Sequence, residues 1–428
     1  MTQQQRTTGM TRSRWWLLGS LYTTQTLGAG FFLVAFTAIL RESGASLDRI
    51  GMVYGLGVVG ALKFLWAPAV DRWRLGQRQA HYRGWLLTMQ AGMFATMLVV
   101  AQLDLGTQFP LIFALCLVSA FFSATQDVAT DALACRLLAP HERAMGNAIQ
   151  GAGGMLGWMI GGGLVLMAYP HMGWTHSLWI LAAGVAVSWL QLLWFNEPVW
   201  PVPQQLPRFA HVRRFWSFWR ESGSGWRWPL LLMLYGTGIS LAYALMTPLI
   251  VDAGWALDRI GFVANVYGMV LGMVASVLAG RYARRVNRQR ALVVAGLVQI
   301  VAVLGVGIVA WGLHTDAAIW WMVSLYFLAY PPATTVLATL IMDHASKEFP
   351  ATDYSMQYGL CFLFSLVASS SGLMLAQRLG YTGAVVVALV LCLLALALAL
   401  IYRPRHGAPA APAAGRTNSQ VTGFKEVL

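Results

Sequence analysis

Long apolar segments recur along the whole chain, separated by short polar stretches that carry most of the charge. Each segment has about 20 residues, the length that an α-helix needs to cross ~30 Å of bilayer hydrocarbon. Twelve segments are predicted to span a membrane: 15–40, 50–70, 85–103, 109–133, 144–168, 177–195, 229–251, 260–280, 291–312, 318–342, 354–376 and 382–402. The pattern predicts an all-α polytopic membrane protein, with a break in the tenth segment at Pro331-Pro332.

The composition agrees with this prediction. Of the 428 residues, 58% are hydrophobic and 11% are charged, whereas soluble domains carry about 25% charged residues. The four cysteines, Cys116, Cys135, Cys361 and Cys392, stand singly in or beside the spans. We therefore expect free thiols, with no disulfide, metal site or cofactor.

A ten-residue pattern occurs twice along the chain. Gly44–Val53 reads GASLDRIGMV and Gly254–Val263 reads GWALDRIGFV, at an offset of 210 residues. Each copy opens a span, and Asp48 and Asp258 are expected near helix N-termini, where a carboxylate is favourable. An offset of nearly half the chain predicts two halves of six spans in the same orientation, related by an axis normal to the membrane.

This repeat predicts four regions: six-helix halves at 1–195 and 229–402, a central loop at 196–228, and a disordered tail at 403–428. The loop is rich in Pro and Arg, and its segment 213–220 is predicted to form a short amphipathic helix at the membrane surface. The tail is rich in Ala, Pro and Gly, which is typical of disorder.

The positive charges predict the orientation of the chain. With twelve spans, 24 of the 29 Lys and Arg residues lie on the side of the two termini, four lie on the opposite side, and Lys63 lies inside the second span. Both termini are therefore expected in the cytoplasm. Because topology accounts for the net charge of +13, we do not predict nucleic-acid binding.

Polar residues inside the fourth span are the candidate transport site. Asp127 and Asp131 are four residues apart and share one helix face, beside Gln126. An intramembrane carboxylate costs roughly 2.5–3.5 kcal/mol and is usually paired or functional. Lys63 is the candidate partner. Three hypotheses remain open: proton coupling by the acids, a fixed Asp127–Lys63 ion pair, or a Lys63 that snorkels to the headgroups.

Further polar residues are candidates for lining a cavity between the halves, although each aromatic residue taken singly favours packing or an interfacial belt over contact with a ligand. They are Tyr22, Gln25, Asn147, Gln150, Tyr235, Tyr330, Tyr354 and Gln357.

In the fifth span, Gly153, Gly157 and Gly161 form a ladder that favours close helix packing.

The stretch from Lys63 to Arg74, KFLWAPAVDRWR, resembles the gating motif of major facilitator transporters. In that family the aspartate at the position of Asp71 contacts a neighbouring helix and holds one conformation closed. The resemblance implies that Asp71 and the adjacent Arg72 belong to a gate, and Arg136 is a candidate for a gate-side salt bridge to Asp131. The family's glycine-rich lead-in is absent here.

The motifs at 63–68, 125–131 and 143–153 are similar to the AmpG-like branch, and most similar to the RhtX/FptX siderophore permeases. This resemblance implies a secondary transporter of the bacterial inner membrane that imports a siderophore, with possible proton coupling, alongside an outer-membrane receptor system that it does not contact directly. The expected partners are the bilayer and a small solute. The alternative is a muropeptide permease.

Other classes of protein fit less well. Drug antiporters of this superfamily carry a proline within the glycine run of the fifth span, and none occurs at 151–163. No Walker A sequence occurs either. An enzyme would need an acid–base constellation, and the outer loops hold few acids or histidines, so we predict no enzymatic activity. A non-transporting sensor stays open.

Overall fold

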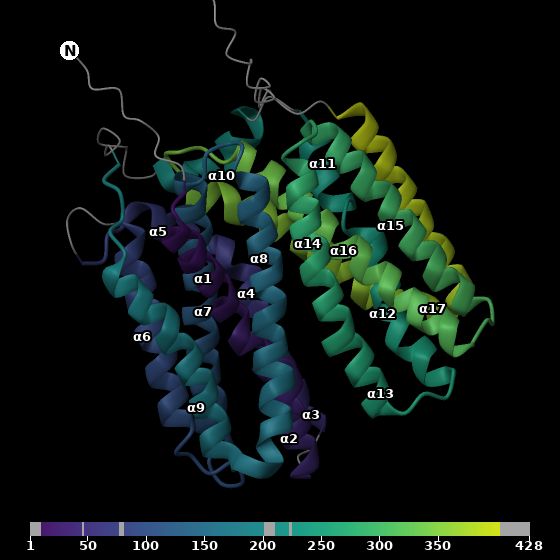
Figure 1. Cartoon of the computed structure of the whole chain (residues 1–428), viewed down its shortest axis with the longest axis horizontal. Helices are drawn as coiled ribbons and strands as arrows, with labels where there is room; N and C mark the ends of the chain where they lie inside the picture. Colours follow the sequence, from purple (N-terminus) through teal and green to yellow (C-terminus); the bar gives the residue numbers. More distant parts are fainter. Residues whose placement is uncertain (1–9, 45–46, 77–80, 201–209, 222–224, 403–428) are drawn as a thin grey trace, which may run out of the picture.

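The computed structural model describes residues 10–44, 47–76, 81–200, 210–221 and 225–402. Within these ranges every regular element is a helix (Figure 1). The predicted disordered tail at 403–428 and part of the central loop lie outside them.

The N-terminal half comprises the first nine helices. Its elements are α1 (Arg12–Gly30), a π-helical turn (Phe31–Phe36), α2 (Thr37–Glu42), α3 (Leu47–Gly55), α4 (Gly57–Leu62), a 3₁₀ turn (Lys63–Leu65), α5 (Ala67–Arg72), α6 (Tyr82–Val100), α7 (Phe109–Leu137), α8 (Arg143–Trp158), a second π-helical turn (Met159–Leu164) and α9 (Val165–Trp194). Asp48 is the second residue of α3, as the repeat predicts.

The C-terminal half follows the linker helix α10 (Ala210–Glu221). It comprises α11 (Arg227–Leu234), α12 (Thr237–Asp252), α13 (Leu257–Phe262), a π-helical turn (Val263–Tyr267), α14 (Gly268–Ala283), α15 (Arg288–Ala310), α16 (Asp316–His344) and α17 (Pro350–Ile401).

The twelve predicted spans are present. Eight helices in the described part of the chain are long and apolar enough to cross a membrane. Two of these have 52 residues and turn back at Gly173 and Gly380, whose φ values of 69° and 72° lie in the left-handed region that glycine adopts without strain. Each therefore provides two spans, and the shorter helices over Gly51–Leu65 and α6 provide the remaining two.

The predicted break at Pro331-Pro332 is wrong, because α16 continues through both prolines. The interruption in this half lies in the seventh span instead, where Tyr235 and Gly236 separate α11 from α12. A proline removes one backbone donor, and packing of a buried helix is able to maintain the helical path through it.

The two halves lie side by side, with α1–α9 on one side of Figure 1 and α11–α17 on the other. The end of the bundle at which α1 begins and α17 ends is called here the terminal end. The α8 and α14 ribbons approach each other at this end and diverge toward the opposite end.

Glycines allow the closest helix contacts of the N-terminal half. A Cβ atom at Gly157 of α8 would lie 2.2 Å from the Thr23 carbonyl oxygen of α1, and one at Gly161 would lie 2.0 Å from the Leu27 carbonyl oxygen. The geometry supports the packing role predicted for this glycine ladder, because no larger residue fits there without moving α1.

Candidate functional site

A buried charged cluster joins the second and fourth spans. Lys63, on the 3₁₀ turn between α4 and α5, donates a hydrogen bond to the Asp127 carboxylate of α7. Its Nζ atom also lies 3.9 Å from Oδ2 of Asp131. The side chains of Lys63 and Asp131 are 5% and 1% exposed, and that of Asp127 is 21% exposed. Of the hypotheses left open by the sequence, the structure therefore shows the Asp127–Lys63 ion pair, and Lys63 is buried instead of reaching the headgroups.

A chain of hydrogen bonds links this cluster to the opposite half. Gln150 of α8 donates from Nε2 to Oδ1 of Asp131 over 2.9 Å. The Tyr354 hydroxyl of α17 donates to Oε1 of Gln150 over 3.1 Å and lies 3.4 Å from Oδ1 of Asn147. Asp131 thus reaches the C-terminal half through a single intervening side chain.

A second contact across the halves involves the lysine itself. The Nζ atom of Lys63 lies 5.1 Å from the centroid of the Tyr358 ring of α17, a distance at which a cation is attracted to an aromatic face. Around the cluster, several buried polar atoms have no hydrogen-bond partner among the described residues, including the Tyr22 hydroxyl, Oε1 of Gln25 and Oδ2 of Asp131. Such unused capacity suits a site that receives a proton, water or solute.

Three predicted site residues lie apart from the cluster. Gln126 donates to a backbone carbonyl and to a threonine hydroxyl of α1, at 3.1 and 3.0 Å. Gln357 accepts from the indole of Trp228 in α11 over 2.8 Å. The Tyr235 hydroxyl donates to a carbonyl of α15 over 2.7 Å. All three therefore hold helices of their own half together.

The terminal end is closed by Asp71. Its carboxylate accepts hydrogen bonds from the backbone N–H of Ala351 (3.0 Å) and Thr352 (2.7 Å) and from the Thr352 hydroxyl (2.6 Å). All three donors belong to the first turn of α17, where free N–H groups and the helix dipole favour an anion. Asp71 therefore makes the contact to the other half that the gating motif implies.

The two arginines assigned to the gate occupy different positions. Arg72 is exposed at the end of α5. The Arg136 guanidinium lies over the rings of Tyr82 (5.7 Å) and Trp200 (5.3 Å). The predicted Asp131–Arg136 salt bridge is not formed, because Asp131 is turned toward Lys63 and Gln150.

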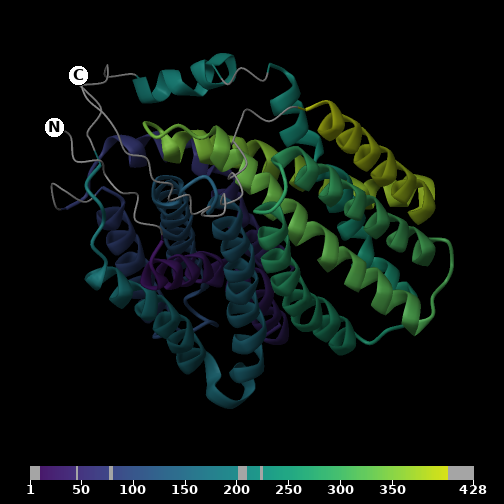
Figure 2. The same ribbon diagram turned by 45° about the horizontal axis from the view of Figure 1, so that its top comes forward.

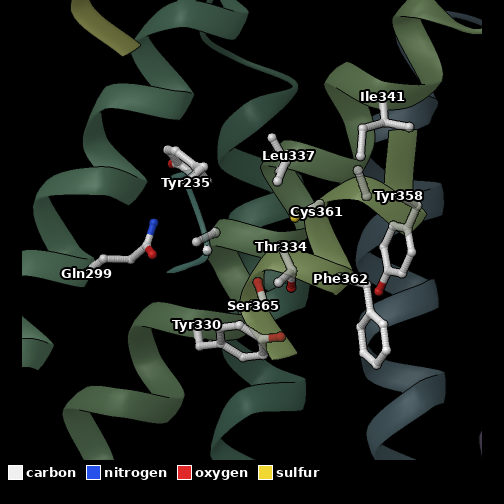
Figure 3. Close-up of a pocket in the computed structure, with 13 residues that line it drawn as sticks. Tyr235, Gln299, Tyr330, Thr334, Leu337, Ile341, Tyr358, Cys361, Phe362 and Ser365 are labelled. Carbon is white, nitrogen blue, oxygen red and sulfur yellow. The ribbon is translucent and has the colours of Figure 1, made fainter. Parts of the chain in front are cut away.

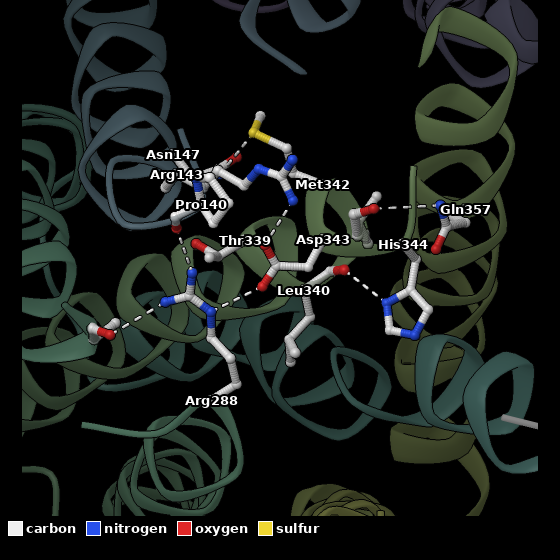
Figure 4. A network of polar contacts seen from close by, with 12 residues as sticks. Pro140, Arg143, Asn147, Arg288, Thr339, Leu340, Met342, Asp343, His344 and Gln357 are labelled. Atoms are coloured by element: carbon white, nitrogen blue, oxygen red, sulfur yellow. Dashed lines mark hydrogen bonds and ion pairs between the residues drawn. The ribbon is translucent and has the colours of Figure 1, made fainter. Parts of the chain in front are cut away.

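Sequence reasoning missed Asp343, at the end of α16. Its two carboxylate oxygens accept from Arg143 of the first half (2.9 Å) and from Arg288 of the second half (2.8 Å), as Figure 4 shows. Arg288 also donates to the carbonyl of Pro140 over 2.8 Å. The sequence contained a signal for this residue. The repeat offset of 210 residues places the equivalent of Asp131 at position 341, two residues from Asp343.

The linker helix α10 was predicted as an element, but not its contacts. Arg214 makes a two-pronged ion pair with Asp353 of α17, at 2.7 and 3.0 Å, and the Asp353 side chain is 0% exposed. Phe215 meets the edge of Phe64, with ring centroids 6.5 Å apart. Figure 2 shows α10 lying along the terminal end. It therefore packs on α5 and α17, and its predicted place at the membrane surface stays a prediction.

Two parallel six-helix bundles that close over a buried ionic cluster define a polytopic transport protein. The chain belongs to the Major Facilitator Superfamily, whose profile matches residues 18–370.

The named relatives include a permease and putative transporters. The chain is 30% identical over 331 residues to the anhydromuropeptide permease of Escherichia coli K12, which covers 74% of this chain and 65% of the relative. It is 23% identical over 383 residues to the putative transporter AmpG 3 of Rickettsia typhi, covering 85% and 90%. The matched region thus spans less than two thirds of the Escherichia coli protein.

Solved structures confirm the fold. The human organic anion transporter MFSD10 superposes with a TM-score of 0.70 at 18% identity, over 91% of this chain and all of that chain. A bacterial homologue of ferroportin superposes with a TM-score of 0.63 at 16% identity, over 92% and 99%. The expected similarity to RhtX/FptX siderophore permeases does not appear among these relatives. The similarities favour the alternative, a muropeptide permease.

Proposed function

We propose that this protein is a secondary permease for muropeptides or related peptidoglycan fragments, in the bacterial inner membrane, with both termini in the cytoplasm. The similarity to AmpG-type permeases supports the substrate class. The observation that carries the transport mechanism is the buried Lys63–Asp127–Asp131 cluster, which is bonded to the opposite half through Gln150 and Tyr354.

The cluster couples a charge change to movement of the halves. Two carboxylates share one ammonium group, so the cluster carries one negative charge until a proton or a cationic group of the solute neutralises it. Neutralising Asp131 weakens the charge-assisted bond from Gln150. This loosens the link from Gln150 to Tyr354, and with it one contact that keeps the terminal end closed.

The test is uptake of radiolabelled anhydromuropeptide by cells that lack their own permease. Expression of this protein is expected to restore uptake, and an uncoupler is expected to abolish it. Asp127→Asn removes the charge that Lys63 neutralises and is expected to lower uptake at least tenfold at unchanged membrane abundance. Asp104→Asn is the matched control, because Asp104 lies in a loop and bonds only to its neighbours.

Three outcomes contradict the proposal. Uptake of a ferric siderophore in place of the muropeptide refutes the substrate class. Full uptake by Asp127→Asn would show that the charged cluster takes no part in transport. Uptake that persists with the uncoupler would show that transport is not coupled to the proton gradient.

A further inference from the structure

Two arginines share one carboxylate where the halves meet at the terminal end. Oδ1 of Asp343 accepts a hydrogen bond from Arg143 of α8 over 2.9 Å, and Oδ2 accepts one from Arg288 of α15 over 2.8 Å (Figure 4). The side chains of Arg143, Arg288 and Asp343 are 12%, 16% and 19% exposed. In the described part of the chain no second acid pairs with either arginine. This ion triad therefore carries one positive charge.

The triad is divided unequally between the halves. Asp343 and Arg288 both belong to the C-terminal half, on the neighbouring helices α16 and α15, whereas Arg143 belongs to the N-terminal half. When the terminal end opens, Arg288 loses its bond to the carbonyl of Pro140 but keeps its carboxylate. Arg143 loses Asp343 itself. Opening thus leaves one guanidinium without its anion on the wall of the passage.

The position of Arg143 is unfavourable for its own helix. It is the first residue of α8, where the helix dipole disfavours a cation. The adjacent Glu142 carboxylate accepts instead from the backbone N–H groups of Met10 and Ala139. The Nε atom of Arg143 is buried and has no acceptor among the described residues. A carboxylate that is not tied to α16 is able to use two donors of the guanidinium together, which is the stronger geometry.

A row of polar side chains joins this arginine to the charged cluster. Arg143, Asn147 and Gln150 follow one another at helical spacing on α8. The Tyr354 hydroxyl donates to Gln150 over 3.1 Å and lies 3.4 Å from Oδ1 of Asn147, and Gln150 donates to Asp131 over 2.9 Å. The row therefore leads from a cluster with one negative charge to a triad with one positive charge.

Other places near the cluster do not suit an anion. Lys63 is already shared by two acids. The pocket beside Tyr358 is lined by uncharged residues, including Tyr235, Tyr330 and Leu337, and none of the side chains labelled in Figure 3 carries a charge. An anionic group that moves along the interface is consequently attracted to Arg143.

We infer that Arg143 binds a carboxylate of the solute when the terminal end is open, in the place that Asp343 takes when this end is closed. A ligand shifts a conformational equilibrium only by its difference in affinity for the two states. Because Asp343 occupies Arg143 in the closed state, the carboxylate binds only after opening, and its binding favours the open state. Arg143 thereby selects acidic solutes at the opening step. This inference rests on the proposed function, because it concerns the passage of the same solute.

The test compares uptake of two forms of radiolabelled anhydromuropeptide: one with free peptide carboxylates and one with these groups converted to amides. The wild type is expected to take up the free acid about tenfold faster, because the amide loses the charge-assisted bonds to Arg143. Arg143→Gln is expected to abolish this preference. It leaves Asp343 paired with Arg288, so the protein retains no unpaired buried acid and is expected to fold. Arg143→Lys keeps the cation and should retain part of the preference.

Two further variants separate carboxylate binding from closure of the terminal end. Asp343→Asn removes the anion that holds the halves together but retains Arg143, so the preference for the free acid should remain. Arg288→Gln is the matched arginine control: Arg288 pairs with the same carboxylate from the second half, and its loss should also leave the preference in place. If Arg143 served closure alone, Arg143→Gln and Asp343→Asn would change the uptake of both forms by the same factor.

Equal uptake of the two forms by the wild type would overturn the inference and leave the proposed function standing. A full preference in Arg143→Gln would do the same. Loss of the preference in Arg288→Gln and Asp343→Asn as well would assign it to the intact triad, and would overturn binding by Arg143. Uptake of neither form by the wild type would refute the inference together with the proposed function.

Discussion

At the scale of single residues, the central feature is a lysine shared by two acids. Lys63 is 5% exposed and has two carboxylates within 3.9 Å, so each charge compensates for the burial of the others. Removing one member of a buried ion pair costs about 3–5 kcal/mol, because the remaining charge is left unpaired.

Lys63→Met is therefore expected to destabilise the protein by about 3–5 kcal/mol. This is measured as a fall in the midpoint of thermal unfolding of the detergent-purified protein, and as reduced membrane abundance. The double variant Lys63→Met/Asp127→Asn removes both charges of the closest pair and should recover part of the lost stability, because the buried Asp131 carboxylate remains without a cation. Uptake is expected to stay at background. If Lys63→Met alone unfolds at the wild-type temperature, the pair contributes nothing to stability.

The sequence named Lys63 as the candidate partner of Asp127, because Lys63 is the single lysine within a span, but it left open whether the two form a fixed pair. It did not predict that Gln126 and Gln357 would face away from the cluster. The rotation of a helix about its axis follows from packing on all sides, and helices that are apolar all round carry little information about it. Gln150 was a candidate, but its position as the link between Asp131 and Tyr354 depends on three helices meeting.

At the scale of elements, the first turn of α17 is held from two directions. From the first half, the Asp71 carboxylate accepts hydrogen bonds from backbone N–H groups of this turn. From the linker, Arg214 of α10 forms an ion pair with Asp353, which is also in this turn. Asp353 is fully buried, so α10 is expected to remain with α17 when the halves separate. The contact between Phe215 and Phe64 is then the one that breaks.

Arg214→Gln leaves the buried Asp353 carboxylate without its cation. We expect a loss of about 3–5 kcal/mol in stability, measured by thermal unfolding in detergent, and a lower transport rate. Arg213→Gln is the matched control: Arg213 is the exposed neighbour on the same helix, and surface changes of this kind usually alter stability by less than about 0.5 kcal/mol. Equal stability of the two variants would show that α10 is only a tether.

The linker also shows what a local pattern leaves open. The sequence predicted a short helix at 213–220 from its mixture of basic and aromatic residues, and the helix is present as α10. A surface helix with one apolar face is equally suited to a bilayer or to a protein surface. The contacts of α10 with Phe64 and Asp353 form only in the assembled terminal end, so the local pattern alone does not predict them.

At the scale of the whole molecule, the hydrogen bonds and ion pairs that cross between the halves gather toward one end. Asp71 with Thr352, and Arg143 and Arg288 with Asp343, lie at the terminal end. The Gln150–Tyr354 bond lies nearer the charged cluster. The repeat predicted two like-built halves, but not which end is closed, because the same sequence must form both states of an alternating cycle.

This arrangement makes a cross-link between α8 and α14 the decisive test of alternating movement. A Cβ atom at Gly151 would lie 3.5 Å from Cβ of Ser276, within the ~3.5–4.5 Å range of disulfides. In a background with the four native cysteines replaced by serine, Gly151→Cys/Ser276→Cys should form a disulfide on oxidation and lose at least nine tenths of uptake. A reducing agent should restore uptake, and each single cysteine variant should be unaffected by oxidation. Because the terminal end is expected to face the cytoplasm, the locked protein should still accept labelling reagents from the periplasmic side. A fully cross-linked protein that transports at the wild-type rate would show that the halves do not separate along α8 and α14, and the solute would then need a route that avoids this interface.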